Sequence, residues 1–155
     1  MEFSDESKEY IEKLKGKYPE QQALLLPVLH LAQKDFGYIY PEVEEYVAGY
    51  LDLPVEHVHG VATFYTMYNK QPVGKYHIQV CTNISCSLLG SEHIVKHLEK
   101  KLGIKPGETT EDGKFTVSEV ECLGACGFAP VMQINDDYYE NLDEEKVDEI
   151  LDGLE

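Results

Sequence analysis

Four cysteines are the residues in this chain of 155 whose type and spacing could do chemistry. Cys81 and Cys86 form one pair with four residues between them, and Cys122 and Cys126 form another with three between them. Cysteine thiolates are ligands for zinc and for the iron of iron–sulfur clusters. Because 35 residues separate the two pairs, the fold has to bring the four sulfur atoms together.

The loop that contains the second pair is rich in small residues and reads Cys-Leu-Gly-Ala-Cys-Gly from Cys122 to Gly127. An iron–sulfur cluster held by four thiolates is an anion, and backbone N–H groups are donors that can stabilise its charge. Gly124 and Gly127 allow the main chain to fold close to sulfur. Cys86 lies near the start of a predicted helix, where N–H groups are unpaired. These features favour an iron–sulfur site.

Other uses of four cysteines have to be compared with this one. A structural zinc site also takes four cysteines, although its cysteine pairs more often have two intervening residues. With zinc bound, the chain would be a zinc-stabilised interaction module. A dithiol oxidoreductase uses a C-x-x-C motif, which the sequence lacks. A [4Fe–4S] cluster more often has a compact run of C-x2-C-x2-C. The spacing alone favours iron and sulfur but leaves zinc open.

The charge and the apolar pattern limit the partners and the compartment. Thirteen basic residues and 29 acidic ones give a formal net charge of −16. Nucleic acid and anionic lipid repel such a chain, so we expect neither as a partner. No signal-peptide pattern is present, and the longest apolar stretch, residues 23–32, is too short to cross a bilayer. We expect a cytoplasmic protein without direct membrane insertion, where cysteines bind metal more often than they form disulfides.

The two halves of the chain differ in their apolar pattern. Spacings of three and four predict helices in the first half, and alternation predicts strands in the second. We therefore expect an α+β protein with a helical domain over residues 1–72 and an α/β domain over residues 73–155. The helices expected in the first half cover residues 5–15, 20–36, 41 to about 50, and 54 to about 65. The second half is expected to contain strand 76–80, a helix from Ser87 or Ser91 to Leu102, strands 115–120, 131–134 and 138–139, and a helix capped by Asp143.

Both cysteine pairs come directly after predicted strands. Cys81 ends the first strand, and Cys122 follows the second. A right-handed crossover through the intervening helix would make these strands parallel, so that their carboxyl ends meet at one edge of the sheet. We expect the four thiols to gather at that edge.

Two histidines offer a weaker metal signal. His93 and His97 stand four residues apart on the predicted helix, which is a spacing that metal pairs use. Their neighbours Glu92 and Lys96 indicate an exposed face, so we expect no metal role for either histidine.

Several sequence blocks in a fixed order resemble one protein family. From about Tyr18 to Leu142, the chain is similar to the small [2Fe–2S] subunit of the NADH-dehydrogenase module of respiratory complex I, NADH:quinone oxidoreductase. Besides the two cysteine loops, the blocks that resemble the family are Gln33–Ile39, Gly60–Tyr65, Pro72–Tyr76, Leu89–Ser91 and Ala129–Val131.

This resemblance implies a fold and an electron-transfer function. The second half would be a thioredoxin-like domain with one [2Fe–2S] cluster, next to a small N-terminal helical bundle. Cys81 and Cys86 would hold one iron, and Cys122 and Cys126 the other. The Ala129–Pro130 peptide bond would be cis, as in many thioredoxin-like folds.

The resemblance also implies partners. The cluster would exchange single electrons with the flavin of an adjacent NADH-oxidising subunit, so FMN and NADH would bind that flavoprotein and not this chain. The chain would contribute no catalytic residue of its own. Other subunits of the peripheral arm would also be partners, on the cytoplasmic side of the inner membrane, and the isolated chain could form a homodimer. Related subunits serve NAD-linked hydrogenases and formate dehydrogenases, which remain alternative hosts.

Overall fold

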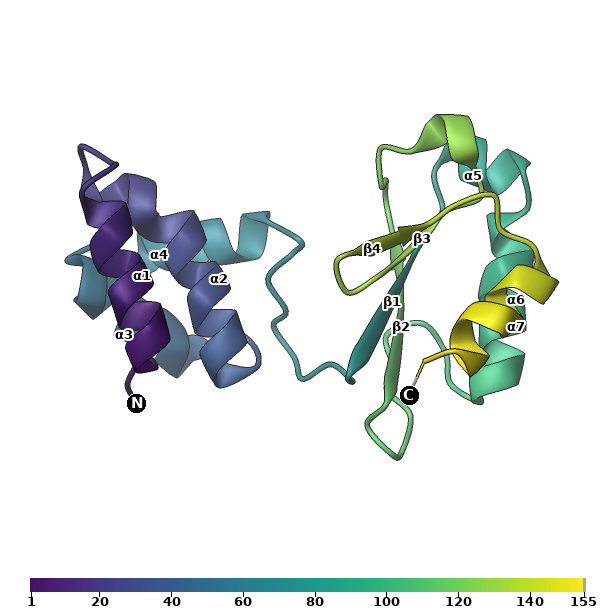
Figure 1. The fold of residues 1–155 in the computed structure, drawn as a ribbon, viewed down its shortest axis with the longest axis horizontal. Helices are drawn as coiled ribbons and strands as arrows, with labels where there is room; N and C mark the ends of the chain where they lie inside the picture. The colour runs from purple at the N-terminus through teal and green to yellow at the C-terminus, as the bar shows by residue number, and fades with distance from the viewer. Residues whose placement is uncertain (155) are drawn as a thin grey trace. The chain divides into compact units, whose positions relative to one another are not determined.

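The computed structural model describes residues 1–154, and the chain divides into two compact units between Pro72 and Val73 (Figure 1). The first unit is helical, and the second contains a four-stranded sheet with helices. Among residues 1–154, no helix is both long and apolar enough to cross a membrane.

Four α-helices make up the first unit, and local signals set their ends. Ser4 caps the first helix by accepting a hydrogen bond from the Ser7 backbone N–H. Gly37, with φ of 88°, ends the second. A proline at the first position starts the third. The helices are α1 (Asp5–Lys15), α2 (Leu25–Phe36), α3 (Pro41–Leu51) and α4 (Val55–Phe64).

The single helix expected over residues 20–36 is wrong in its first part. A 3-10 turn covers Gln21–Leu24, and α2 begins only at Leu25. Pro27 explains the difference, because its ring clashes with the carbonyl four residues earlier in a continuing α-helix. In the first turn of α2, by contrast, backbone N–H groups have no acceptor within the helix, so Pro27 costs no hydrogen bond there.

The core of the first unit is apolar side chains from all four helices. Ile11, Val28, Val43 and Val58 are fully buried there. Tyr68, which follows α4, is also buried and donates a hydrogen bond from its hydroxyl to the Leu26 carbonyl at 2.9 Å. Loss of water around this phenol raises the pKa of Tyr68 to about 12.

The second unit is a mixed sheet with helices, and its four strands follow one another along the chain as the sequence predicts. The strand order is β2-β1-β3-β4, with β1 and β2 parallel and the other neighbouring pairs antiparallel. Asn135, with φ of 54°, begins the two-residue turn between the last two strands. The elements are β1 (Tyr76–Cys81), α5 (Ile84–Leu88), α6 (Ser91–Leu102), β2 (Phe115–Val120), β3 (Met132–Ile134), β4 (Asp137–Tyr139) and α7 (Glu144–Asp152).

The helix expected from Ser87 or Ser91 to Leu102 is confirmed with its start at Ser91, and it is preceded by a short helix, α5, that the sequence did not predict. Asn83 caps the short α5, and α6 starts afresh at Ser91. Gly90 separates them because its φ of 97° lies in the left-handed region, which a continuous right-handed helix does not contain.

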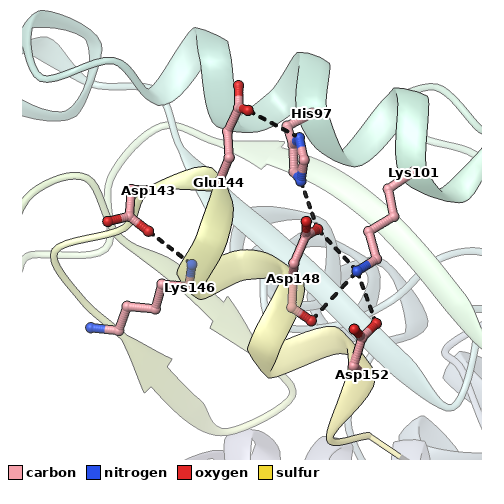
Figure 2. Close-up of polar contacts among 7 residues, drawn as sticks. All are labelled: His97, Lys101, Asp143, Glu144, Lys146, Asp148 and Asp152. Atoms are coloured by element: carbon pink, nitrogen blue, oxygen red, sulfur yellow. Dashed lines mark hydrogen bonds and ion pairs between the residues drawn. The ribbon is translucent and has the colours of Figure 1, made fainter.

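Charged side chains join α7 to α6 on the outside of the second unit. Figure 2 shows the His97 ring between Asp148, 2.7 Å from Nε2, and Glu144, 3.6 Å from Nδ1. Lys101 Nζ lies 2.9 Å from carboxylate oxygens of both Asp148 and Asp152. The expectation that His97 lies on an exposed face is therefore wrong. Its side chain is 17% exposed, because α7 covers it.

Candidate metal centre

The carboxyl ends of β1 and β2 place one cysteine from each predicted pair at the same edge of the sheet. Cys81 is the last residue of β1 and pairs in register with Val120, the last residue of β2. Cys122 follows Val120 by two residues. The backbone N–H of Thr82 donates to the Val120 carbonyl at 3.1 Å, so the two chain segments stay paired just beyond the strands.

Asn83 fixes the first cysteine loop to the second. Its side-chain oxygen accepts from the Ile84 N–H at 2.8 Å, which starts α5 and places Cys86 in the middle of that helix. Its side-chain nitrogen donates to the Glu121 carbonyl at 2.7 Å, next to Cys122. One asparagine therefore holds both loops. The sequence analysis missed this residue, although an asparagine directly before a predicted helix is a recognisable capping signal.

The second cysteine loop has a tight turn near its start, and the same part of the loop is fixed to the sheet. Gly124, with φ of 72°, turns its N–H toward the Cys122 sulfur at 3.3 Å. The hydroxyl of Tyr138, on β4, donates to the Leu123 carbonyl at 3.1 Å. Cys126 begins a short 3-10 turn that ends at Phe128. The loop is therefore shaped by its own backbone and fixed to the sheet.

The four thiols lie together at this edge. The Cys81 thiol is in hydrogen-bond contact with those of Cys86 and Cys122, and Cys126 lies near enough to Cys86 to affect its charge. Within residues 1–154, no three His, Cys, Asp or Glu side chains are grouped so as to hold a single metal ion. A [2Fe–2S] cluster distributes its four protein ligands over two irons, so it requires two pairs of thiolates.

Burial and hydrogen bonds shift the pKa values of the two buried thiols in opposite directions. Burial works to raise the pKa of Cys81, but hydrogen bonds from the backbone N–H groups of Asn83 and Leu123 and from two neighbouring thiols outweigh it and lower that pKa. Burial and the contact with Cys81 raise the pKa of Cys86, against a hydrogen bond from the Val131 N–H. Of these two buried thiols, Cys81 is therefore the one whose thiolate is favoured, and the thiolate is the form that binds metal.

Burial divides the site into a covered side and an open side. Cys81 and Cys86 are buried against Ala129 and Val131, whereas Cys122 and Cys126 are exposed. The Ala129–Pro130 peptide bond before this wall is cis, as expected. One half of the site is thus sealed by apolar side chains, and the other half lies at the surface.

Exposed apolar side chains lie on the segments that carry the cysteines. Ile84 and Leu88 stand on either side of Cys86 in α5, and Leu88 is 80% exposed. Leu89 and Phe128, which follow α5 and Cys126, are also exposed. Exposed apolar groups that gather in this way are typical of a surface that contacts another protein.

The residues present fit an iron–sulfur cluster. The Cys81 thiol contacts those of Cys86 and Cys122, and Cys126 lies near Cys86. The N–H groups of four residues point to sulfur: Asn83, Leu123, Gly124 and Val131. Donors of this kind stabilise the negative charge of thiolates bound to iron.

Comparison with known proteins identifies the family to which this fold and site belong. The family described as thioredoxin-like [2Fe-2S] ferredoxin matches residues 11–155. The E subunit of NADH-quinone oxidoreductase from Rickettsia conorii is 52% identical over 156 residues, which cover 99% of this chain and 93% of the relative. The E 2 subunit of NADH-quinone oxidoreductase from Rhizobium meliloti is 48% identical over 147 residues, which cover 95% of this chain and 88% of the relative.

Among solved structures, NAD+-reducing [NiFe]-hydrogenase in the air-oxidized state is similar with a TM-score of 0.72. The likeness covers 84% of this chain and 22% of the hydrogenase chain, and at 24% identity it shows the fold alone. The fold class and the family expected from the sequence are confirmed. This chain belongs to the thioredoxin-like [2Fe–2S] ferredoxin family, together with the E subunits of NADH-quinone oxidoreductase.

Proposed function

We propose that this chain is the electron-transfer subunit of an NADH:quinone oxidoreductase and that its four cysteines hold the family's single [2Fe–2S] cluster. Cys81 and Cys86 bind one iron, and Cys122 and Cys126 bind the other. The observation that carries the proposal is the gathering of these four thiols, from two loops 35 residues apart, at one edge of the sheet.

When bound, the cluster accepts and returns one electron at a time. This chain's own residues position it and set its surroundings. Asn83 holds the two ligand loops at a fixed separation, and the Gly124 N–H stabilises negative charge on the Cys122 sulfur. Ala129 and Val131 keep water from Cys81 and Cys86. No bond of a substrate is made or broken on this chain, so no residue here has to act as a general acid or base.

The open side of the site is where electrons enter and leave. Cys122 and Cys126 are exposed there, and the exposed apolar side chains of Leu88 and Phe128 belong to neighbouring segments. A partner that covers this side excludes water between the redox groups. The partner is the flavoprotein that oxidises NADH, so FMN and NADH bind that flavoprotein.

The relatives support one of the alternative host assemblies. The curated relatives that share about half of this sequence are named as E subunits of NADH-quinone oxidoreductase, which supports that enzyme over a hydrogenase or a formate dehydrogenase. Other subunits of its peripheral arm are further partners, and the chain lies on the cytoplasmic side of the inner membrane. A family described by its [2Fe–2S] cluster gives no support to the zinc-stabilised module.

The two compact units are proposed as separate domains, a helical domain over residues 1–72 and a thioredoxin-like domain over residues 73–155. Each unit has its own set of buried apolar side chains, which is the physical requirement for independent folding. Formation of a homodimer by the isolated chain stays a prediction.

Single replacement of each ligand by serine tests the assignment. Cys81→Ser, Cys86→Ser, Cys122→Ser and Cys126→Ser should each lower the iron retained on purification and change the low-temperature EPR signal of the reduced protein, because an alkoxide is a harder ligand than a thiolate. Ser85→Ala, in the same loop as Cys86, is the control and should keep the wild-type signal. An unchanged signal and iron content in any of the four cysteine variants would remove that cysteine from the ligand set.

A further inference from the structure

A glycine lies exposed in the interior of α4, on the helical unit and outside the metal centre. Gly60 stands between the fully buried Val58 and Ala62. A methyl group added at Gly60 would meet nothing within 4 Å. Glycine destabilises a helix interior relative to alanine, and no packing within the described chain requires it at this position. The space over Gly60 is therefore available to a group that approaches from outside.

Gly60 forms part of an open groove with aromatic walls. The groove has a volume of about 370 Å³ and is lined by Glu56, His57, Gly60, Val61, Phe64 and Tyr65. Phe64, one helical turn after Gly60, is 77% exposed, which is unusual for a side chain of this size. An open glycine beside an exposed aromatic ring permits close approach of another chain.

The Phe64 ring is supported from the core. It lies edge-on to the Tyr65 ring with centroids 5.0 Å apart, and Tyr65 lies edge-on to Tyr68 at 6.4 Å. Tyr68 is buried and fixed by its hydrogen bond to Leu26. The exposed ring is thus held in place before any partner arrives, which reduces the entropy lost on binding. Aromatic residues, phenylalanine among them, are enriched at protein–protein contacts.

The charge of the groove and of the whole chain indicates which kind of partner binds there. Glu56 is the one carboxylate that lines the groove, and no lysine or arginine lines it within the described residues. With a net charge of −16 on the whole chain, a second copy is repelled, whereas a partner with basic residues is attracted.

We propose that the groove over Gly60 docks an apolar segment of the NADH-oxidising flavoprotein, with a lysine or arginine of that segment paired with Glu56. The identity of this partner rests on the proposed function. The contact is a second docking point, on a different unit from the redox site, and it assigns a role to the helical unit.

The test compares two exposed glycines on different helices, each with open space for an added methyl group. The full-length protein with its cluster is mixed with the purified flavoprotein, and the dissociation constant is measured for Gly60→Ala, Gly60→Trp, Phe64→Ala and Gly49→Trp. Gly49 is an exposed glycine on α3 whose added methyl group also meets nothing within 4 Å. The iron content, the EPR signal and the melting temperature of each isolated variant are recorded alongside.

We expect Gly60→Trp and Phe64→Ala to weaken binding at least tenfold, and Gly49→Trp to leave it unchanged. Gly60→Ala should raise the melting temperature of the isolated chain while its binding is weakened or unchanged, never strengthened. If Gly60 served only the stability of the fold, larger side chains at this position would not raise the melting temperature in one variant and weaken binding in another. All variants should keep the wild-type EPR signal, because none touches the metal centre.

Three outcomes would overturn the proposal. Wild-type affinity in Gly60→Trp would show that the groove is not a contact with the flavoprotein. A lower melting temperature in isolated Gly60→Ala would show that the space is used within the chain itself. Loss of a homodimer in Gly60→Trp, with flavoprotein binding intact, would assign the groove to a second copy. A wild-type protein without iron would contradict the proposed function instead, and that result is visible before any binding is measured.

Discussion

Replacing Gly124 with alanine should weaken both the fold and the electron affinity of the metal centre. Gly124 has φ of 72°, and a side chain in the left-handed region costs about 1–2 kcal/mol. Because an added methyl group would meet nothing within 4 Å, the cost comes from the backbone and not from a clash. We therefore expect the free energy of unfolding to fall by roughly 1–2 kcal/mol.

Relaxation of that strain moves the Gly124 N–H away from the Cys122 sulfur, to which it donates at 3.3 Å. A hydrogen bond to a charged acceptor contributes about 1.5–3 kcal/mol. The reduction potential depends only on the difference in this hydrogen-bond energy between the reduced and the oxidised cluster. If that difference is about 1 kcal/mol, the potential falls by roughly 40 mV, since a tenfold change in a one-electron equilibrium is about 59 mV.

Gly127→Ala is the matched control for this prediction. Gly127 lies in the same loop, also has open space for a methyl group, and does not have a left-handed φ. Urea unfolding of the cluster-loaded protein measures the stability, and a redox titration followed by EPR measures the potential. Equal effects of the two substitutions on both quantities would refute the reasoning, because only Gly124 combines the strained backbone with the hydrogen bond to sulfur.

Three further predictions concern the surroundings of the site and the two units. The pKa of Tyr68 is raised to about 12, so the folded state holds this proton more tightly; its contribution is complete below pH 10 and is lost as the pH rises toward 12. Tyr68→Phe should therefore remove part of the alkaline loss of stability seen by urea unfolding between pH 9 and 12. Hydrogen bonds from His97 and Lys101 hold the pKa of Asp148 below its ordinary 3.8, so its contribution is present above that pH and is lost as the pH falls through the lowered pKa. Asp148→Asn should flatten the acid side of the stability curve, and an unchanged slope would mean that the pair in Figure 2 contributes nothing. Leu88→Glu should slow electron exchange with the flavoprotein in stopped-flow measurements while the EPR signal stays that of the wild type, and an unaltered rate would place the electron contact elsewhere.

Local patterns in the sequence were sufficient to predict much of the second unit. The alternation of Tyr76, Ile78 and Val80 placed β1, because one face of that strand is buried. The residues after Ile134 predicted a tight turn, and Asn135 takes the positive φ that such turns need. These signals depend only on neighbouring residues, so they can be read without the tertiary structure.

The breaks in the helices were harder to predict. The pattern around Pro27 suited a longer helix, and the short α5 before Gly90 was not predicted. The actual ends depend on which side chains the rest of the unit buries. His97 was assigned to an exposed face because its sequence neighbours are charged, but α7 covers it from more than 40 residues away. Contacts of that range are not encoded in local periodicity.

For the metal centre too, some features could be predicted from the sequence and others could not. The types and spacing of the cysteines favoured an iron–sulfur site over zinc, because the pairs of a zinc site more often have two intervening residues. The spacing could not show that Asn83 joins the two loops or that Cys81 and Cys86 are the buried pair. Those facts depend on the register of β1 with β2, which only the folded sheet defines.

The central claim is that the four cysteines of this chain hold one [2Fe–2S] cluster, and the metal content of the purified wild-type protein tests it most directly. Iron, acid-labile sulfide and zinc would be assayed on one anaerobic preparation, with low-temperature EPR before and after dithionite. We expect about two irons and about two sulfides per chain and an EPR signal that appears only after reduction. A colourless protein with about one zinc per chain, silent in EPR in both states, would contradict it.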